Sequence, residues 1–321
     1  MTAPNYSPTW PELAFSNREE WLSARNQLGI GASEVSALFN DPKNPLRGIS
    51  SFDSPVSLNW RKRGLIGREE RTAEEEEHLE WSTFIEPAIA GWFERKVMAE
   101  KEPFASLVDP GQWTIQTAAA DRNLQVVPWF STLDRVLVDE SGKPIAVLEI
   151  KNASEFMRSE WTEEPPLSYQ LQVQTQLAVT GLPYGYLIAA IGGRAPKWAR
   201  INRSEKVIGI IRDRVTAAWG LIQRQEDPPM DAHPKTSSAI LHRWPNDSGE
   251  RVALPLASSE HWDLRQAFGT KIQALELERD LLTNELKAAI GGASFGDLPD
   301  GRSLSLKTDK RGVRSLREVA A

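Results

Sequence analysis

The sequence contains no cysteine. That absence excludes structural disulfides, iron–sulfur clusters held by thiolates and a cysteine nucleophile. Histidine is scarce as well. The histidines do not approach the spacing of zinc ligands, so zinc is not expected at His78, His233, His242 or His261.

Long apolar runs are also missing. No uninterrupted apolar stretch is long enough to span a membrane, and the polar N-terminus M-T-A-P-N-Y-S-P has no signal-peptide core. Apolar residues make up 40% of the chain and charged residues 26%, as in soluble globular proteins. We therefore expect a cytoplasmic protein with no membrane partner.

Positive charge is not in excess, because the formal net charge is −6. This argues against a surface coated with DNA-binding charge, although net charge does not locate patches. Two local exceptions are the triplet Arg61–Arg63 and the tail 302–317, which has six basic residues and one acidic residue. The run Glu74–Glu77 is the opposite case. Charge runs usually form solvated surface, and we expect that of all three.

The length of 321 residues allows a substantial buried core, as one large domain or as a domain with an appendage. Residues 1–225 mix helical and strand patterns, which predicts one α/β domain. Prolines recur between 226 and 257, which predicts a loop-rich connection. Residues 258–321 are expected to form a long helix followed by the basic tail.

The predicted long helix covers residues 258–290 and is stopped by Gly291-Gly292. Apolar residues recur along it every seven positions, at Phe268, Leu275, Leu282 and Ala289. Arg279 interrupts this seam. We therefore expect a helix that packs on the chain or on a partner, not a long coiled coil.

Two segments that read as strands, 132–138 and 145–150, flank a turn that contains glycine and proline. In an extended chain Glu149 and Lys151 point to the same side, about 7 Å apart. Burying two charges there is costly unless they pair with each other or hold a metal. A hairpin can bring Asp134 close to both, so an ion pair and a metal site are both open.

Two further stretches place polar residues at expected helix starts. Glu86 immediately precedes Pro87, a pair that predicts the beginning of a helix, where the carboxylate complements the helix dipole. The glycines before Ser33 allow this serine to cap a short helix. Amide groups at such a helix start, with Arg25 nearby, would suit a phosphate. A Walker loop is excluded, because no Gly-Lys-Ser/Thr follows.

Four glutamines alternate with mostly apolar residues between positions 170 and 176, as in a strand. The same residues fit a helix that ends at Gly181. A helix would place Gln172 and Gln176 on one face. The pattern leaves both interpretations open.

Four motifs, taken in order, resemble a known family. They are G-I-G-A-S-E-V near the N-terminus, the Glu-Pro pair, D…E-I-K and Q-V-Q-T-Q-L-A-V-T-G. This order is similar to that in phage lambda exonuclease and the YqaJ-like viral recombinases, which are PD-(D/E)XK nucleases. The resemblance covers roughly residues 20–225. It departs from the family at two positions: Arg135 stands where glycine is usual, and Glu34 where aspartate is frequent.

The resemblance implies an α/β, restriction-endonuclease-like core with a central mixed sheet flanked by helices, plus a C-terminal helical extension. It also implies a metal site. Asp134 and Glu149, with the main-chain carbonyl of Ile150, would be oxygen ligands of Mg²⁺, for which Mn²⁺ can substitute. Glu86 would complete the metal shell.

The remaining roles follow from the same resemblance. Lys151 would lie beside the attacking water, and Gln172 would help to position it. Arg25 and Ser33 match the family positions implicated in holding the 5′ end of the degraded strand.

The function that the resemblance implies is a Mg²⁺-dependent 5′→3′ exonuclease on linear double-stranded DNA, which leaves 3′ single-stranded DNA for phage-type recombination. The expected setting is the cytoplasm of a bacterial host, with the protein encoded by a phage or prophage. Expected partners are DNA ends, a single-strand annealing protein and further copies of the chain in a homo-oligomer, a trimer in the family. The alternatives are an endonuclease or RecB-like nuclease of other polarity, and a non-catalytic module that binds DNA ends.

Overall fold

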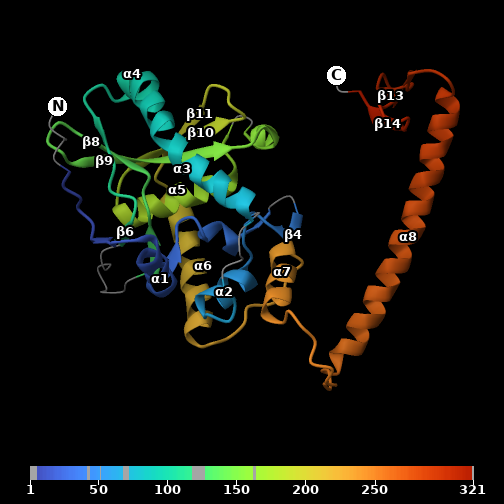
Figure 1. Ribbon diagram of the computed structural model, residues 1–321, viewed down its shortest axis with the longest axis horizontal. Helices are drawn as coiled ribbons and strands as arrows, with labels where there is room; N and C mark the ends of the chain where they lie inside the picture. Colours follow the sequence, from blue (N-terminus) through green and yellow to red (C-terminus); the bar gives the residue numbers. More distant parts are fainter. Residues whose placement is uncertain are drawn as a thin grey trace. The chain divides into compact units, whose positions relative to one another are not determined.

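The computed structural model describes six stretches of the chain, residues 6–41, 44–50, 52–67, 72–117, 127–161 and 164–319 (Figure 1). Contacts divide the chain into two compact units, Met1–Asn246 and Asp247–Ala321. None of the helices in the described stretches combines the length and apolar character that a bilayer crossing requires.

A mixed five-stranded sheet forms the centre of the first unit (Figure 1). Its strands, in spatial order, are β11 (Lys197–Asn202), β10 (Tyr184–Ile191), β9 (Pro144–Ala153), β8 (Arg135–Val138) and β5 (Ser106–Val108). Strands β9 and β10 run parallel, and the other neighbours run antiparallel. The central mixed sheet expected from the sequence is therefore present.

A smaller mixed sheet lies in the same unit. Its strands, in spatial order, are β1 (Glu12–Ala14), β6 (Thr114–Thr117), β7 (Trp129–Ser131) and β2 (Ile30–Gly31). Strands β2 and β7 are parallel. A two-stranded ribbon follows, made of β3 (Asn40–Asp41) and β4 (Asn44–Gly48).

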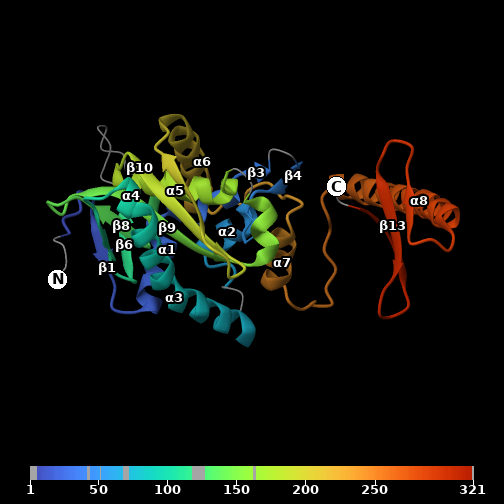
Figure 2. The ribbon, with the colours of Figure 1, turned by 90° about the horizontal axis from the view of Figure 1, so that it is seen from above.

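Helices cover both faces of the five-stranded sheet (Figure 2). Helix α3 (Ala73–Phe93) packs on one face and α5 (Leu167–Thr180) on the other. The other helices of this unit are α1 (Arg18–Leu28), α2 (Pro55–Lys62), α4 (Ala99–Lys101), α6 (Glu205–Gln223) and α7 (Pro234–Arg243). Short 3₁₀ helices complete it at η1 (Val35–Leu38) and η3 (Glu155–Glu160), and a π-helical segment at η2 (Glu94–Met98).

The alternation of side chains along β9 decides where its charged residues point. Leu148 and Ile150 pack in the core beneath α3, whereas Val147 packs in the core beneath α5. Glu149 and Lys151 share the parity of Val147. They therefore extend from the α5 face of the sheet.

Helix α3 begins earlier than the sequence predicts. A capping box formed by Thr72 and Glu75 starts it, and acidic residues follow in its first turn. Pro87 accordingly lies inside the helix and not at its beginning. The prediction of a helix start at Glu86 is wrong, because the capping box upstream already satisfies the first free N–H groups.

The segment expected to be a loop-rich connection, 226–257, contains helix α7. Its Thr236 and Ala239 are buried, and the Thr236 hydroxyl donates a hydrogen bond of 2.7 Å to Ser54 Oγ at the start of α2. The first compact unit therefore extends to Asn246.

The second unit consists of one long helix and a small sheet. Helix α8 (Ala257–Ile290) occupies the segment in which the sequence predicts a long helix. The tail forms an antiparallel meander, β12 (Phe295–Asp297), β13 (Ser303–Thr308) and β14 (Arg314–Glu318).

Candidate active site

Strands β8 and β9 form the predicted hairpin, and Asp134 lies directly before β8. The turn uses Gly142, whose φ of 85° lies in the left-handed region. The ladder pair nearest the site joins Arg135 and Leu148. Beyond it, the main-chain N–H of Ile150 donates to Asp134 Oδ2 at 2.7 Å. The carboxylate of Asp134 thus occupies the gap where the two strands separate.

Glu149 is at the centre of the site, and its side chain is 2% exposed. Its Oε1 lies 2.5 Å from Lys151 Nζ and accepts a hydrogen bond of 2.6 Å from Gln172 Nε2. Its Oε2 accepts a hydrogen bond of 2.5 Å from Gln176 Nε2. Both glutamines come from α5, which ends at Gly181, so the helix interpretation of this segment holds and the strand interpretation does not. Three donors explain how a buried carboxylate is tolerated here.

The second carboxylate is less well compensated. Burial, together with repulsion by Glu149, raises the pKa of Asp134 well above its ordinary value, although Lys151 opposes this. Burial alone would lower the pKa of Lys151, but attraction by Glu149 and Asp134 prevails and raises it. Lys151 is therefore charged at neutral pH. With both carboxylates ionised, one lysine leaves a negative charge at this site, which a divalent cation would offset.

Glu86 of α3 lines the same cavity but is drawn to an arginine. Arg135 Nη1 lies 2.8 Å from Glu86 Oε1 and 3.4 Å from Asp109 Oδ2. Burial raises the pKa of Glu86, and Arg135 opposes this. Within the described stretches, no three His, Asp or Glu side chains are arranged as a metal cage. Arg135 pairs with Glu86 and Asp109, and Lys151 pairs with Glu149.

Arg25, in the last turn of α1, occupies a separate part of the site. Its Nη1 donates to Thr132 Oγ1 at 2.9 Å, and its Nη2 donates to Ser33 Oγ at 3.1 Å. The guanidinium carbon lies 4.5 Å from the ring centroid of Trp21 and 5.2 Å from that of Phe130. Its buried Nε has no hydrogen-bond partner among the described residues.

The sequence suggested that Ser33 could cap a short helix. In the structure it does not. The single turn Val35–Leu38 that follows has no side-chain cap, and the Ser33 hydroxyl accepts the Arg25 bond. Sequence reasoning missed Thr132, the second acceptor, because nothing in its local sequence distinguishes it from any strand-end threonine.

Two glycines make room for this arrangement. A Cβ at Gly29 would lie 2.1 Å from the carbonyl oxygen of Pro128, and the φ of Gly29 is 134°. A Cβ at Gly31 would lie 2.9 Å from the Phe130 ring and 3.3 Å from Arg25 Nη2. Gly29 therefore allows the close approach to the main chain of Pro128, and Gly31 leaves room for Phe130 and the Arg25 guanidinium.

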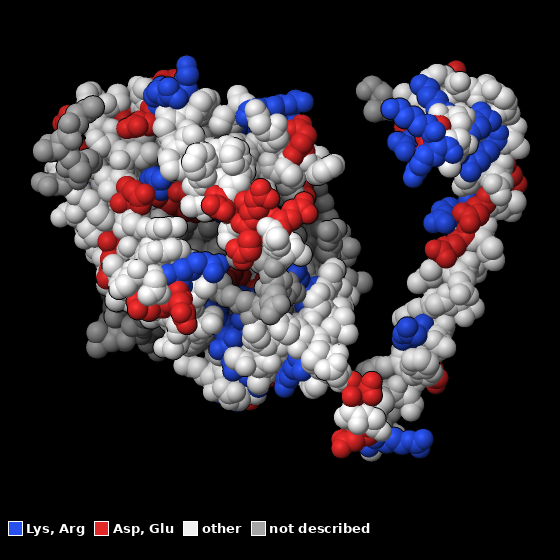
Figure 3. All heavy atoms as spheres, viewed as in Figure 1, with Lys and Arg blue, Asp and Glu red and all other residues white. Residues whose placement is uncertain are grey.

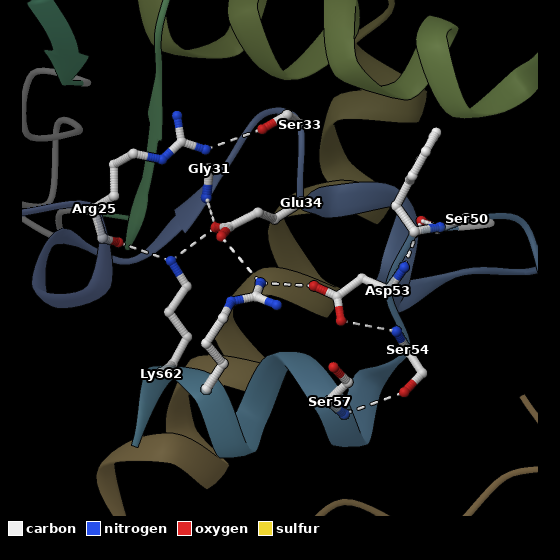
Figure 4. Close-up of polar contacts among 11 residues, drawn as sticks. Arg25, Gly31, Ser33, Glu34, Ser50, Asp53, Ser54, Ser57 and Lys62 are labelled. Atoms are coloured by element: carbon white, nitrogen blue, oxygen red, sulfur yellow. Dashed lines mark hydrogen bonds and ion pairs between the residues drawn. The ribbon is translucent and has the colours of Figure 1, made fainter. Parts of the chain in front are cut away.

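The charged triplet Arg61–Arg63 was expected to be solvated surface, and that prediction is wrong. The Lys62 side chain is 0% exposed, with Nζ 2.7 Å from Glu34 Oε2 (Figure 4). Arg61 Nη2 lies 2.6 Å from Asp53 Oδ2. Arg61 also lies 3.3 Å from Glu34 Oε1, so Arg61 and Lys62 share this carboxylate.

The candidate active site is a single cavity of about 660 Å³. All the side chains predicted for the site line it, namely Arg25, Ser33, Glu86, Asp134, Glu149, Lys151 and Gln172. Thr132 and Arg135 line it too. The run Glu74–Glu77 lies exposed at the beginning of α3, where Figure 3 shows acidic side chains gathered.

A mixed sheet flanked by helices, with buried carboxylates and a lysine on adjacent strands, defines the chain as a PD-(D/E)XK-type α/β protein. The family model described as YqaJ-like viral recombinase domain matches residues 20–183, half of the chain. The chain belongs to this family. The family indicates a nuclease that acts on DNA in recombination with a divalent cation, and a phage origin.

Two solved structures are similar to this chain. Both are of an alkaline exonuclease, LHK-Exo, from Laribacter hongkongensis, and one contains dAMP. Their sequence identities are 19% and 18% and their TM-scores 0.46 and 0.45, with 65% of this chain and 94% of that chain covered in each. No curated protein sequence matches this chain.

Proposed function

We propose that this protein is a Mg²⁺-dependent exonuclease that degrades one strand of linear double-stranded DNA from its 5′ end. The product would be a 3′ single strand for recombination. One observation carries this proposal: a single cavity contains both a carboxylate–lysine cluster and a separate arginine pocket lined with hydroxyl groups. The first part suits phosphodiester hydrolysis, and the second suits a terminal phosphate.

The donor set fits Mg²⁺. Asp134 and Glu149 would hold the cation, and Mg²⁺ commonly uses one or two carboxylates while it keeps several waters. The main-chain N–H of Ile150 points into the gap between β8 and β9. Its carbonyl shares that edge of the strand, so it is the third ligand we propose. When bound, the cation would neutralise the scissile phosphate and the leaving oxygen.

Lys151 and Gln172 would act on the attacking water. Lys151 carries its charge beside Glu149 and lies 5.2 Å from the ring centroid of Tyr169, so it is held within the cavity. Its ammonium group would orient the water and lower its pKa. The Gln172 amide, anchored on Glu149, would keep the water in line with the phosphate.

Glu86 has a less direct role in this proposal than Asp134 and Glu149 have. Because Arg135 holds it at 2.8 Å, Glu86 would complete the metal shell only through water or after Arg135 moves. Arg135 itself places a fixed positive charge in the cavity. This charge stands where the family usually has glycine.

Arg25 would bind the terminal 5′-phosphate. A terminal phosphate carries more negative charge than an internal diester, and a planar guanidinium can bind two of its oxygens at once. The hydroxyls of Ser33 and Thr132 now accept its N–H groups, and they could turn to donate to the phosphate. Stacking against Trp21 and Phe130 holds the guanidinium plane.

The proposal includes assembly with other chains, namely a homo-oligomer and a single-strand annealing protein. Support comes from α8, whose apolar seam is exposed at Phe268, Ile272, Leu275 and Leu282. Exposed apolar surface of this extent commonly marks an interaction site.

The proposal is tested with duplexes labelled at either end. Linear DNA with a 5′-phosphate should be digested from the 5′ end in Mg²⁺ or Mn²⁺, and more slowly with a 5′-hydroxyl. EDTA or Ca²⁺ should stop cleavage, and closed circles should survive. Arg25→Ala should remove most of the preference for phosphate. Cleavage of circles would indicate an endonuclease, release of the 3′ label first would reverse the polarity, and binding without cleavage would indicate an end-binding module.

A further inference from the structure

A buried network of charged side chains lies behind Arg25 (Figure 4). We propose that its Lys62–Glu34 ion pair is a positioning device for the Arg25 pocket. The pair would set both the shape and the net charge of the pocket, and through them its selectivity for a terminal phosphate. This inference rests on the end recognition described under Proposed function.

The Lys62 amine connects the two sides of the Arg25 pocket. Lys62 Nζ donates to the main-chain carbonyl of Arg25 at 2.7 Å and lies 2.7 Å from Glu34 Oε2. The same Oε2 accepts the N–H of Gly31 at 2.8 Å. Lys62 therefore ties the end of α1, which carries Arg25, to the turn that carries Ser33. The spacing between guanidinium and hydroxyl depends on this tie.

The ion pair is strongly favoured in its surroundings. Burial alone would raise the pKa of Glu34, but attraction by Lys62, Arg25 and Arg61 prevails and lowers it to about 2. The carboxylate is therefore ionised at neutral pH. Arg61 lies 3.3 Å from the other oxygen of Glu34, so loss of Lys62 would remove the shorter of two ion pairs and leave Arg61 as the remaining partner.

The charges of the network do not cancel. Three cations, Arg25, Arg61 and Lys62, face two carboxylates, Glu34 and Asp53, which leaves one positive charge. Of these five described side chains, Arg25 is the one that lines the cavity. The excess charge therefore acts on whatever binds at Arg25. A doubly charged terminal phosphate gains more from it than a singly charged diester.

Two substitutions shift this charge in opposite directions. Lys62→Met keeps the length of the side chain but removes the excess charge and the tie to Arg25. Glu34→Gln keeps an oxygen for the N–H of Gly31 and adds one unit of positive charge to the network. A merely structural role predicts that both variants weaken the pocket alike. The proposed role predicts effects of opposite sign.

The measurement is the ratio of the Kd values for 5′-hydroxyl and 5′-phosphate duplexes in a Lys151→Ala background, which removes cleavage. We expect Lys62→Met to lower this ratio on the order of ten-fold and Glu34→Gln to raise it several-fold. Arg63→Met, at the residue that directly follows the same helix, is the matched control. It removes a cation whose partner, Asp227 at 2.5 Å, belongs to a different cluster. The control should leave the ratio unchanged.

The outcomes distinguish a failure of this inference from a failure of the proposed end recognition on which it rests. Equal Kd values for the two ends in the Lys151→Ala background itself would overturn the proposed end recognition and this inference with it. A preference that Arg25→Ala removes, but that Lys62→Met and Glu34→Gln leave unchanged or lower together, would overturn this inference alone. If Lys62→Met does not fold by its thermal melting curve, Glu34→Gln decides, and a ratio that fails to rise overturns the proposal.

Discussion

The two units of the chain treat charge and apolar surface in opposite ways. The first unit buries charge: Glu149 is 1% exposed and the Lys62 side chain 0%. The second unit exposes apolar surface: in α8, Phe268 is 61% exposed and Leu282 54%. Leu306 of the small sheet is buried in the second unit.

The difference lies in how the side chains of each unit are supported. Buried charges are tolerated in the first unit because they form ion pairs or hydrogen bonds, and such contacts hold functional groups in fixed places. The helix α8 has no comparable internal support, and long helices in proteins gain most of their stability from packing. The first unit contains the candidate active site. The second is the unit for which we propose contact with another molecule.

The largest effect should come from Lys151→Ala in the first unit. Loss of the cation beside Glu149 should lower kcat by roughly a thousand-fold, because the attacking water loses its orienting group. The Kd for DNA should change little, since the groove loses one charge. Single-turnover digestion of 5′-phosphorylated duplex measures the first quantity. Lys143→Ala, in the exposed turn of the same hairpin, is the control and should digest DNA at the wild-type rate. Near-native turnover of Lys151→Ala would mean that the Glu149–Lys151 ion pair has a purely structural role.

A pair of leucine truncations sharpens the comparison of the two units. Leu177→Ala, in the core between α5 and the sheet, should lower the free energy of unfolding by about 3 kcal/mol through the cavity it leaves. Leu282→Ala, on α8, should change it by less than about 0.5 kcal/mol when the protein is alone. Urea unfolding of dilute protein measures both. A large cost for Leu282→Ala would mean that α8 is already packed in the free protein.

Removal of residues 293–321 should weaken DNA binding but should not abolish cleavage. The tail from 302 to 317 has six basic residues and one acidic residue, and we expect it to contact DNA or a partner. Affinity for duplex DNA should fall on the order of ten-fold at low salt, with a shallower salt dependence. Cleavage at saturating DNA should persist. Glutamine at Lys307, Lys310 and Arg311 tests the same idea without deletion. A truncated protein that folds but does not cleave would place the tail in the catalytic machinery.

The smallest effect concerns Arg135, which the family resemblance marks as unusual. Arg135→Gly frees the carboxylates of Glu86 and Asp109 from their ion pairs with the guanidinium. Affinity for Mn²⁺ should rise roughly three- to ten-fold, since cations gain from each uncompensated carboxylate. Titration calorimetry without DNA measures it.

The control for this prediction is Arg158→Ala, which breaks the exposed Arg158–Glu155 pair elsewhere. It should leave Mn²⁺ affinity unchanged. Weaker Mn²⁺ binding by Arg135→Gly would show that Arg135 supports the metal site instead of competing for Glu86.

Part of the site could be predicted because its residues are close in sequence. Asp134, Glu149 and Lys151 lie on two strands joined by one short turn, so the period of a strand and the chemistry of a hairpin place them together. The glutamines of α5 remained ambiguous, because a short apolar and polar alternation fits a strand or a helix face. Packing on the sheet resolved this. Four residues span about 6 Å in a helix but about 13 Å in a strand, so only a helix lets both Gln172 and Gln176 reach Glu149.

The sequence by itself determined the hairpin, the acidic-x-lysine strand end, the long C-terminal helix and, through the order of its motifs, the family. Only the tertiary structure showed that Arg135 holds Glu86, that Thr132 faces Arg25, and that Lys62 lies buried against Glu34. The physical reason is distance along the chain. Local patterns follow from helix and strand periods, whereas these contacts join elements that meet only when the chain folds, and a charged side chain looks the same in sequence whether water or a buried partner will surround it.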